Sequence, residues 1–202
     1  MARAAIGKWG LGGPGSTGEP NAHGFDHFYG HLCQAVAHNH YTDHVWRDRQ
    51  RIDLEGNVKG NVVGKQYAPD LMADDAIAFI QANKDRPFFL YFATPLPHVS
   101  LQVPEDSLKP YLGVLEEGQI PGTRMADYTP HPTPHAAYAG MVSRLDSYLG
   151  RIMATLKELE LDENTIVIFT SDNGPTLDHS GGSDSEFFES AGPLRGLKGG
   201  LY

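Results

Sequence analysis

The sequence predicts an α/β protein with a mostly parallel central sheet and flanking helices. Continuous apolar runs at residues 88–93 and 165–170 predict buried strands, because a strand covered on both faces does not alternate apolar and polar residues. A long amphipathic pattern predicts a helix over residues 136–161 between them. A strand, a helical crossover and a second strand in this order require parallel pairing.

The run at residues 165–170 is expected to be the central strand, and it ends in the polar turn Ser171-Asp172-Asn173-Gly174. Ligands of open α/β sheets bind beyond the carboxyl ends of the strands. Asp172 and Asn173 are therefore candidate ligand-binding residues. Their carboxylate and amide oxygens suit Ca²⁺ or Mg²⁺ better than Zn²⁺. An Asx turn that holds no metal is the alternative interpretation.

Weaker patterns predict the remaining elements. A helix is expected from Tyr67 to Lys84, with Pro69 in its first turn. The alternation around Ile52 and Leu54 predicts a hairpin within residues 51–63, turning at residues 55–57. Residues 7–18 and the proline-rich residues 99–136 are expected to be loops.

Composition excludes several classes of protein. The 202 residues suffice for one domain with its own core, and the net charge of −9 argues against a nucleic-acid partner. Cys33 is the only cysteine, so no intrachain disulfide forms. The longest apolar run, residues 87–93, is too short to cross a bilayer, and the first ten residues lack the apolar region of a secretory signal.

Histidines gather in one part of the chain: six fall between His23 and His44. Their spacing matches neither a zinc finger nor an HExxH helix. We expect several of them to line a polar cleft and others to be exposed. A zinc site is the less favoured interpretation.

Four separate stretches carry residues that could meet in one cleft: Lys8 in a glycine-rich loop, His98 after the first apolar strand, Asp172-Asn173 after the second, and Lys198 near the end. Two lysines and a divalent cation at one site imply a phosphate or sulfate ester. Histidine is the side chain whose pKa allows proton donation to a leaving oxygen near neutral pH. The structural alternatives are solvated lysines and a hydrogen-bonded turn histidine.

Taken together, these motifs resemble a known family. GKWGLG at 7–12, PFFLYFATPLPHVSLQVP at 87–104, the helix at 138–156, TIVIFTSDNG at 165–174 and LRGLKGG at 194–200 occur in the order found in sulfatases. The chain resembles the arylsulfatase A type within the alkaline-phosphatase-like superfamily, and residues 24–46 resemble the bacterial members. The resemblance covers nearly the whole chain.

The resemblance implies roles for five residues. Asp172 and Asn173 match the pair that binds the divalent cation, which is usually Ca²⁺, with Mg²⁺ as the alternative. Lys8 matches the lysine that contacts the sulfate and the nucleophile, and Lys198 matches a lysine that binds a sulfate oxygen. His98 matches the histidine assigned to the leaving oxygen. In such enzymes a formylglycine hydrate, made from cysteine or serine, attacks sulfur and later releases inorganic sulfate.

The sequence also departs from the family pattern. Gly10 stands where the family motif has histidine. The CxPSR or SxPSR sequence that becomes formylglycine is absent, since Cys33 lies in CQAVA, and so are the paired aspartates of the family's first strand. We therefore expect residues 1–202 to be an internal part of a sulfatase catalytic domain, cut at both ends. Alone, this part is expected to be inactive.

Two other functions follow from the same features. A phosphodiesterase or phosphonate hydrolase of the same superfamily would share the metal-bearing strand. A non-catalytic relative that binds sulfated glycans would explain Gly10. The substrate is expected to be a small-molecule or glycan sulfate ester, and the resemblance implies a periplasmic, secreted or lysosomal location.

Overall fold

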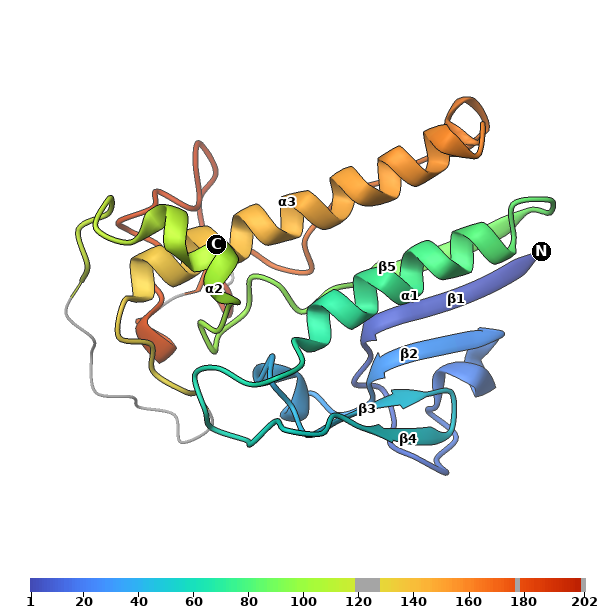
Figure 1. The fold of residues 1–202 in the computed structure, drawn as a ribbon, viewed down its shortest axis with the longest axis horizontal. Coiled ribbons are helices and arrows are strands. Elements are labelled where there is room, and N and C mark those ends of the chain that lie inside the picture. Colours follow the sequence, from blue (N-terminus) through green and yellow to red (C-terminus); the bar gives the residue numbers. More distant parts are fainter. Residues whose placement is uncertain (119–127, 177–178, 201–202) are drawn as a thin grey trace.

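The protein folds around one five-stranded sheet with the strand order β4-β3-β2-β1-β5 (Figure 1). The computed structural model describes residues 1–118, 128–176 and 179–200. The strands are β1 (Ala2–Lys8), β2 (His27–His31), β3 (His44–Arg47), β4 (Gln50–Asp53) and β5 (Phe88–Ala93). β1 pairs in parallel with β2 and β5, whereas β2-β3 and β3-β4 are antiparallel. The α/β class is confirmed, and its sheet is mixed.

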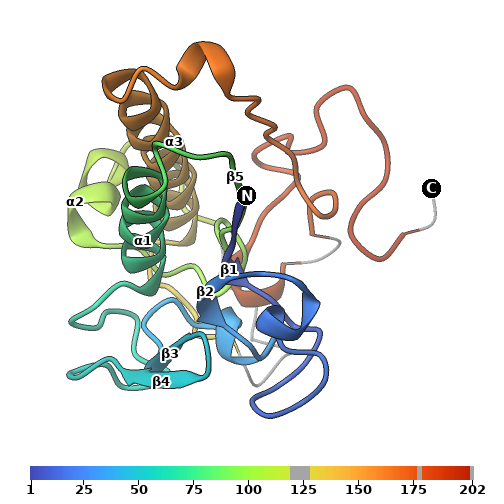
Figure 2. The ribbon, with the colours of Figure 1, turned by 90° about the vertical axis from the view of Figure 1, so that its right-hand side faces the viewer.

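Two long helices cover one side of the sheet, and the irregular segments that follow β1 and the second long helix lie on the other (Figure 2). They are α1 (Ala68–Ala82) and α3 (Pro134–Glu158), and a short α2 (Glu105–Leu108) lies beside α3. Single turns of 3₁₀ helix occur at Pro20–His23, Val36–His38, Lys109–Tyr111, Asp162–Asn164 and Ser180–Gly182. Both long helices lie where the sequence predicts them. In the described parts of the chain, no helix is long and apolar enough to cross a membrane.

The main core lies between the sheet and the two long helices. Its buried side chains come from the sheet and from both helices, and among them are Ile6, Tyr29 and Val45 from strands, Met72, Ala76, Phe79 and Ile80 from α1, and Ile152 and Leu156 from α3. Met72, Ala76, Phe79 and Ile80, which recur at helical spacing in the sequence, therefore form the buried face of α1. On α3, Val142 and Met153 share the apolar spacing of the amphipathic pattern but are exposed, whereas Tyr148 is buried.

Three local predictions need correction. The hairpin turns at Asp48, which has a positive φ, and not at residues 55–57, because aspartate tolerates the left-handed conformation that a tight hairpin requires. Residues 2–8 and 27–31 are strands, although their alanines, glycines and histidines are weak strand formers. Lys8 is consequently the last residue of β1 and not part of a loop.

The predicted central strand at residues 165–170 is wrong for this structure. The segment is extended, but it belongs to no strand, and no backbone hydrogen bond joins residues 166–169 to another described segment. Its side chains face solvent: Ile166 is 90% exposed and Ile168 is 81% exposed. A strand requires a neighbouring backbone that supplies donors and acceptors, and none of the described segments offers one here. The apolar run therefore identifies a segment capable of pairing, not one that is paired.

The two long helices are joined by a charged cluster. Arg144 on α3 donates to both carboxylate oxygens of Asp70 on α1, from Nε at 2.7 Å and from an Nη at 2.6 Å. The hydroxyl of Tyr148 donates to the same carboxylate at 2.5 Å. A bidentate arginine pair of this kind fixes orientation as well as distance. The cluster sets the position of α3 over α1.

Replacing Asp70 should therefore destabilise the chain. In Asp70→Asn, the guanidinium of Arg144 loses its bidentate partner in a half-buried site and keeps only Asp106 as a charged partner, which costs about 2 kcal/mol. Asp74→Asn is the matched control, because Asp74 also pairs across the two helices, with Arg151, but at an exposed site, where an ion pair contributes about 0–1 kcal/mol. Urea unfolding of both variants measures the difference, and equal losses would contradict this account.

The exposed 166–169 segment predicts an unusual tolerance to polar substitution. Ile166→Lys with Ile168→Lys should leave the free energy of unfolding within about 0.5 kcal/mol of the parent chain, because both side chains are already in water. The double variant should also aggregate less, since exposed apolar strand segments promote association. Urea unfolding and light scattering measure the two effects. Ile6→Thr, in the buried part of β1, is the control that should lose about 2 kcal/mol or more.

Candidate functional site

The candidate site lies at the edge of the sheet where three parallel strands end. β1 ends at Lys8, which is in register with His31 at the end of β2. On the other side, Gly7 of β1 is in register with Ala93, the last residue of β5. Beyond β1 the parallel ladder continues, because Trp9 N donates to the carbonyl oxygen of His31 at 3.0 Å. The backbone on both sides of Lys8 is therefore fixed.

Two glycines allow these strand ends to approach closely. Gly7 has a φ of +120°, and a Cβ at that position would lie 2.0 Å from the carbonyl oxygen of Ala93. A Cβ on Gly30 would lie 2.0 Å from the carbonyl oxygen of Gly7. Neither position has room for any side chain. Lys8 takes its place in the site because the residue before it is a glycine.

His98 lies five residues beyond the end of β5 and is half-buried. Its Nδ1 donates to the carbonyl oxygen of Val99 at 2.5 Å, because a carbonyl can only accept. Its Nε2 therefore carries the lone pair, and it lies 3.4 Å from the ammonium nitrogen of Lys198. The side chain of His40 donates to the carbonyl oxygen of His98 at 2.8 Å, so the backbone of this residue is held as well as its ring.

Electrostatic coupling links four of the predicted site residues. Burial lowers the pKa of Lys8, the nearby Lys198 lowers it further, and Asp172 acts in the opposite direction. Burial also lowers the pKa of His98. Lys8 and Lys198 lower it further, and Asp172 raises it. Two ammonium groups and an imidazole thus share a small region with one carboxylate. Such an excess of positive charge favours an anionic ligand.

Asp172 and Asn173 differ in how well they are placed. Asp172 is exposed and close enough to Lys8 and His98 to influence their titration. The Asn173 amide donates to the carbonyl oxygen of Gly174 at 2.9 Å, which leaves its own carbonyl oxygen available. No contact joins Asn173 directly to Lys8, His98 or Lys198 among the described residues. Its association with the site rests on its neighbour in the chain.

The two oxygen donors fit part of a cation site. A carboxylate and an amide carbonyl are hard ligands of the kind Ca²⁺ and Mg²⁺ prefer, but Ca²⁺ takes six to eight oxygens. Within residues 1–118, 128–176 and 179–200, no three His, Cys, Asp or Glu side chains are placed to hold a metal ion. A cation at Asp172 and Asn173 needs further ligands from elsewhere.

Several residues near the site were not predicted individually. The ring of His38 stacks on His98, with ring centroids 4.7 Å apart and an interplanar angle of 3°. Tyr128 packs against both rings. His31 and His40 are fully buried, and both ring nitrogens of His31 lack a hydrogen-bonding partner among the described protein groups. The density of histidines between residues 23 and 44 was the available signal, but it did not identify which of them reach the site.

Gly10 has a structural reason to be glycine. Its φ is +92°, a left-handed conformation that other residues adopt at a cost, and a Cβ there would lie 2.8 Å from Cγ of Gln34. A histidine at position 10 would require both a strained backbone and movement of Gln34. The departure from the family motif is therefore matched by the local backbone.

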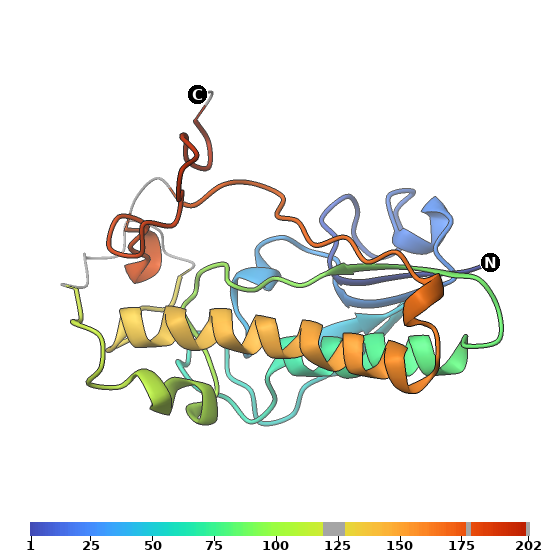
Figure 3. The ribbon, with the colours of Figure 1, turned by 90° about the horizontal axis from the view of Figure 1, so that it is seen from above.

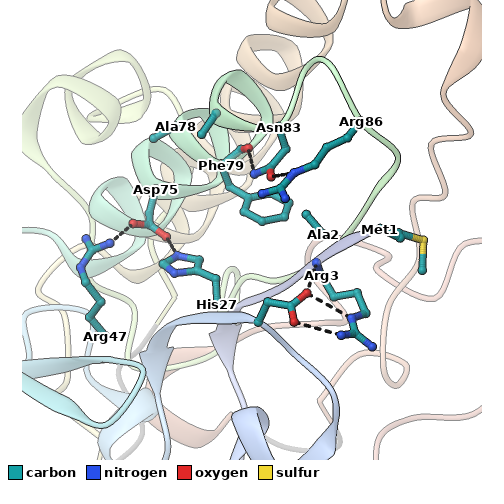
Figure 4. A pocket seen from close by; sticks show the side chains of 12 residues that line it. Met1, Ala2, Arg3, His27, Arg47, Asp75, Ala78, Phe79, Asn83 and Arg86 are labelled. Atoms are coloured by element: carbon teal, nitrogen blue, oxygen red, sulfur yellow. Dashed lines mark hydrogen bonds and ion pairs between the residues drawn. The ribbon is translucent and has the colours of Figure 1, made fainter.

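A pocket of about 570 Å³ lies at the end of the sheet opposite Lys8, where β1 and β2 begin (Figure 4). Most of its charged side chains are paired with each other, whereas Arg86 donates to the side chain of Asn83 at 2.7 Å. Asp75 on α1 accepts from Arg47 at 2.8 Å and contacts His27 at 2.5 Å, and Arg3 pairs with Asp26 at 2.9 Å. The two pairs made by Asp75 join β2 and β3 to α1, so these charges hold elements of the fold together.

The fold, together with the positive charge of Lys8 and Lys198 where the parallel strands end, defines an α/β protein suited to binding an oxyanion. The family model for Sulfatase matches residues 2–201, and the chain belongs to the sulfatase family. It is 29% identical to the arylsulfatase of Klebsiella aerogenes over 83% of this chain and 43% of that protein. It is 28% identical to the N-acetylgalactosamine-6-sulfatase of Canis lupus familiaris over 97% of this chain and 35% of that protein.

Solved structures show the same fold. Ps i-CgsB, solved in complex with k-i-k-neocarrahexaose, superposes with a TM-score of 0.67 at 24% identity, over 92% of this chain and 40% of that one. BT4656, solved with D-glucosamine-2-N,6-O-disulfate, superposes with a TM-score of 0.59 at 20% identity, over 85% and 47%. The fold is therefore that of the alkaline-phosphatase-like sulfatases. This chain spans less than half the length of each of these relatives.

Burial of His31 predicts a dependence of stability on pH. Burial, with contributions from His40, His44 and Lys8, lowers its pKa from 6.5 to about 3. Below pH 6.5 the unfolded chain therefore takes up a proton that folded His31 does not, and stability falls as the pH drops toward about 3, by up to about 1.4 kcal/mol per pH unit. His31→Met, which does not titrate, should lose less stability between about pH 7 and about pH 5.

The control for this prediction is His23→Ala, because His23 is exposed. Urea unfolding at both pH values should show the full acid sensitivity in His23→Ala and a reduced sensitivity in His31→Met. An unchanged acid sensitivity in His31→Met would mean that His31 already titrates normally in the folded chain.

Proposed function

We propose that this chain carries part of the catalytic site of a sulfatase, an enzyme that hydrolyses sulfate esters. The observation that supports this most directly is the meeting of Lys198 Nζ and His98 Nε2 at 3.4 Å, in the electrostatic field of Lys8. The three residues come from stretches 90 or more positions apart. Because the chain belongs to the sulfatase family, we interpret their meeting as part of a site that acts on sulfate esters. Aryl sulfates and sulfated sugars are both candidate substrates.

The two lysines would bind the sulfate group. A sulfate ester presents oxygens that carry more negative charge as the bond to the leaving oxygen breaks. Ammonium groups fixed beside those oxygens stabilise that charge, and more strongly where water is partly excluded. Lys8 is half-buried on a fixed strand end, whereas Lys198 is exposed. Lys8 therefore provides the more rigid of the two contacts.

His98 would supply the proton for the leaving oxygen. At rest its Nδ1 proton is held by the carbonyl of Val99, and its Nε2 accepts. A proton taken up at Nε2 can pass to the leaving oxygen while the Nδ1 hydrogen bond persists. The His98 ring therefore keeps one orientation throughout the transfer and need not turn.

Asp172 and Asn173 would hold a divalent cation, Ca²⁺ or Mg²⁺, together with ligands from outside this chain. The cation would polarise a sulfate oxygen when bound. The attacking group expected of the family is formylglycine, which supplies a hydrated aldehyde as nucleophile. Cys33 lies outside the required sequence pattern, so the precursor must come from residues beyond these.

The extent of the chain supports its interpretation as part of a larger catalytic domain. It spans 43% of the Klebsiella arylsulfatase and 35% of the canine N-acetylgalactosamine-6-sulfatase. We infer that residues 1–202 alone do not turn over sulfate esters, because no attacking group is present. Sulfated glycans are favoured as substrates by the names of the relatives, and a periplasmic, secreted or lysosomal location by the family.

Sulfate binding to this chain tests the proposed site without requiring turnover. Lys8→Met and Lys198→Met should each weaken inorganic sulfate binding about tenfold, since each removes a charge-assisted contact worth about 1.4 kcal/mol or more. Lys157→Met is the control, because this lysine is exposed at the far end of α3. Affinity should also fall as the pH rises through the lowered pKa of Lys8. Titration calorimetry measures each value.

Two results would contradict the proposal. Sulfate affinity that is unchanged in both lysine variants would place anion binding elsewhere. Phosphate diesters hydrolysed in preference to sulfate esters by the full-length protein that carries this chain would favour the phosphodiesterase alternative instead.

A further inference from the structure

We propose that His38 is a positioning residue that fixes the ring of His98 in the orientation needed for proton transfer. The inference rests on the proposed role of His98 as proton donor. It concerns a residue that the sequence motifs did not single out, from a different part of the chain. The argument combines ring geometry with the backbone contacts that hold the two segments together.

The rings of His38 and His98 lie face to face. Their centroids are 4.7 Å apart and their planes differ by 3°. Tyr128 closes the cluster from a third segment, with centroids 5.2 Å from His38 and 6.0 Å from His98. A ring stacked in this way cannot rotate about its Cβ–Cγ bond without losing the contact. Stacked aromatic pairs contribute about 0.5–1.5 kcal/mol beyond the area they bury.

The backbones that carry the two rings are tied to each other. Ser100 N donates to the carbonyl oxygen of His38 at 2.9 Å. The His40 side chain donates to the carbonyl oxygen of His98 at 2.8 Å, and His40 N donates to the side chain of Gln102, also at 2.8 Å. Residues 38–40 and 98–102 thus form one rigid unit. The stack is built into this unit and is not a contact between two independent surface rings.

His98 needs this support because its own anchor is local. Within its own strand–loop segment, its ring is held by the Nδ1 hydrogen bond to Val99, the adjacent residue. Flipping the ring by half a turn would exchange each ring nitrogen with a ring carbon, which would break the Nδ1 hydrogen bond and move the Nε2 lone pair away from Lys198. His38 opposes that flip through the stack. The planar face of His38, and not its nitrogens, is what the positioning role requires.

Ring tautomers in this chain give the first test. Long-range ¹H–¹⁵N spectra of the ring-labelled protein should show His98 as a single Nδ1–H tautomer. His38→Ala should give a mixture of tautomers, and His38→Phe, which keeps a flat ring, should restore the single form. His23→Ala is the control and should leave His98 unchanged. A single tautomer in His38→Ala would overturn the inference.

Leaving-group dependence in the full-length protein gives the second test. Proton donation matters most for esters with a poor leaving group. His38→Ala should therefore lower kcat at least about tenfold more for an alkyl sulfate than for nitrophenyl sulfate, and His38→Phe should recover most of that loss. Equal losses on both substrates, or no recovery with phenylalanine, would overturn the positioning role.

His98→Ala separates this inference from the function on which it rests. If His98→Ala shows the leaving-group effect and His38→Ala does not, the proton-donor role stands and the positioning role of His38 fails. If His98→Ala itself shows no leaving-group effect, the proposed role of His98 fails, and the inference fails with it. Tautomer mixing in His38→Ala together with the leaving-group effect supports both.

Discussion

The arrangement of the site depends on the close approach of three parallel backbones at the end of β1. Gly7 faces the carbonyl of Ala93, and Gly30 faces the carbonyl of Gly7, with no space for a side chain at either glycine. Because the strands are parallel, their carboxyl ends emerge at one edge. Lys8 and the segment leading to His98 thereby start from neighbouring points. The position of Lys8 beside the segment that leads to His98 follows from this steric requirement.

Much of the fold could be predicted from local patterns. The amphipathic spacing of α1 and α3 and the apolar run of β5 record burial directly in the sequence, so these elements were found. β1 and β2 were missed because alanine, glycine and histidine give little signal for a strand, and their pairing is decided by distant neighbours. The same dependence on distant neighbours explains the error at residues 165–170. An apolar run shows that pairing is possible, whereas pairing itself requires an adjacent backbone.

The site residues show a similar division. Lys8, His98, Asp172, Asn173 and Lys198 were identified by motifs whose order resembles a family, and their roles remain proposals here. In the structure, Lys8, His98, Asp172 and Lys198 lie close enough to influence each other's charge. The tautomer of His98 and its stack with His38 were beyond the reach of sequence patterns. Both depend on contacts between segments about 60 positions apart, which no local periodicity records.

Asp172 and Asn173 follow the exposed, unpaired segment at residues 166–169, and this position affects the free energy of binding a cation. The view from above shows the segment after α3 running over the sheet as an extended chain, outside the layer of helices (Figure 3). With no ladder to fix it, a bound cation would have to supply the free energy of immobilising these residues, about 1–2 kcal/mol for each backbone position. Ion capture and local folding would then be a single coupled event. A strand paired with residues 166–169 would fix this segment before the cation binds. It would therefore raise cation affinity without contributing a ligand.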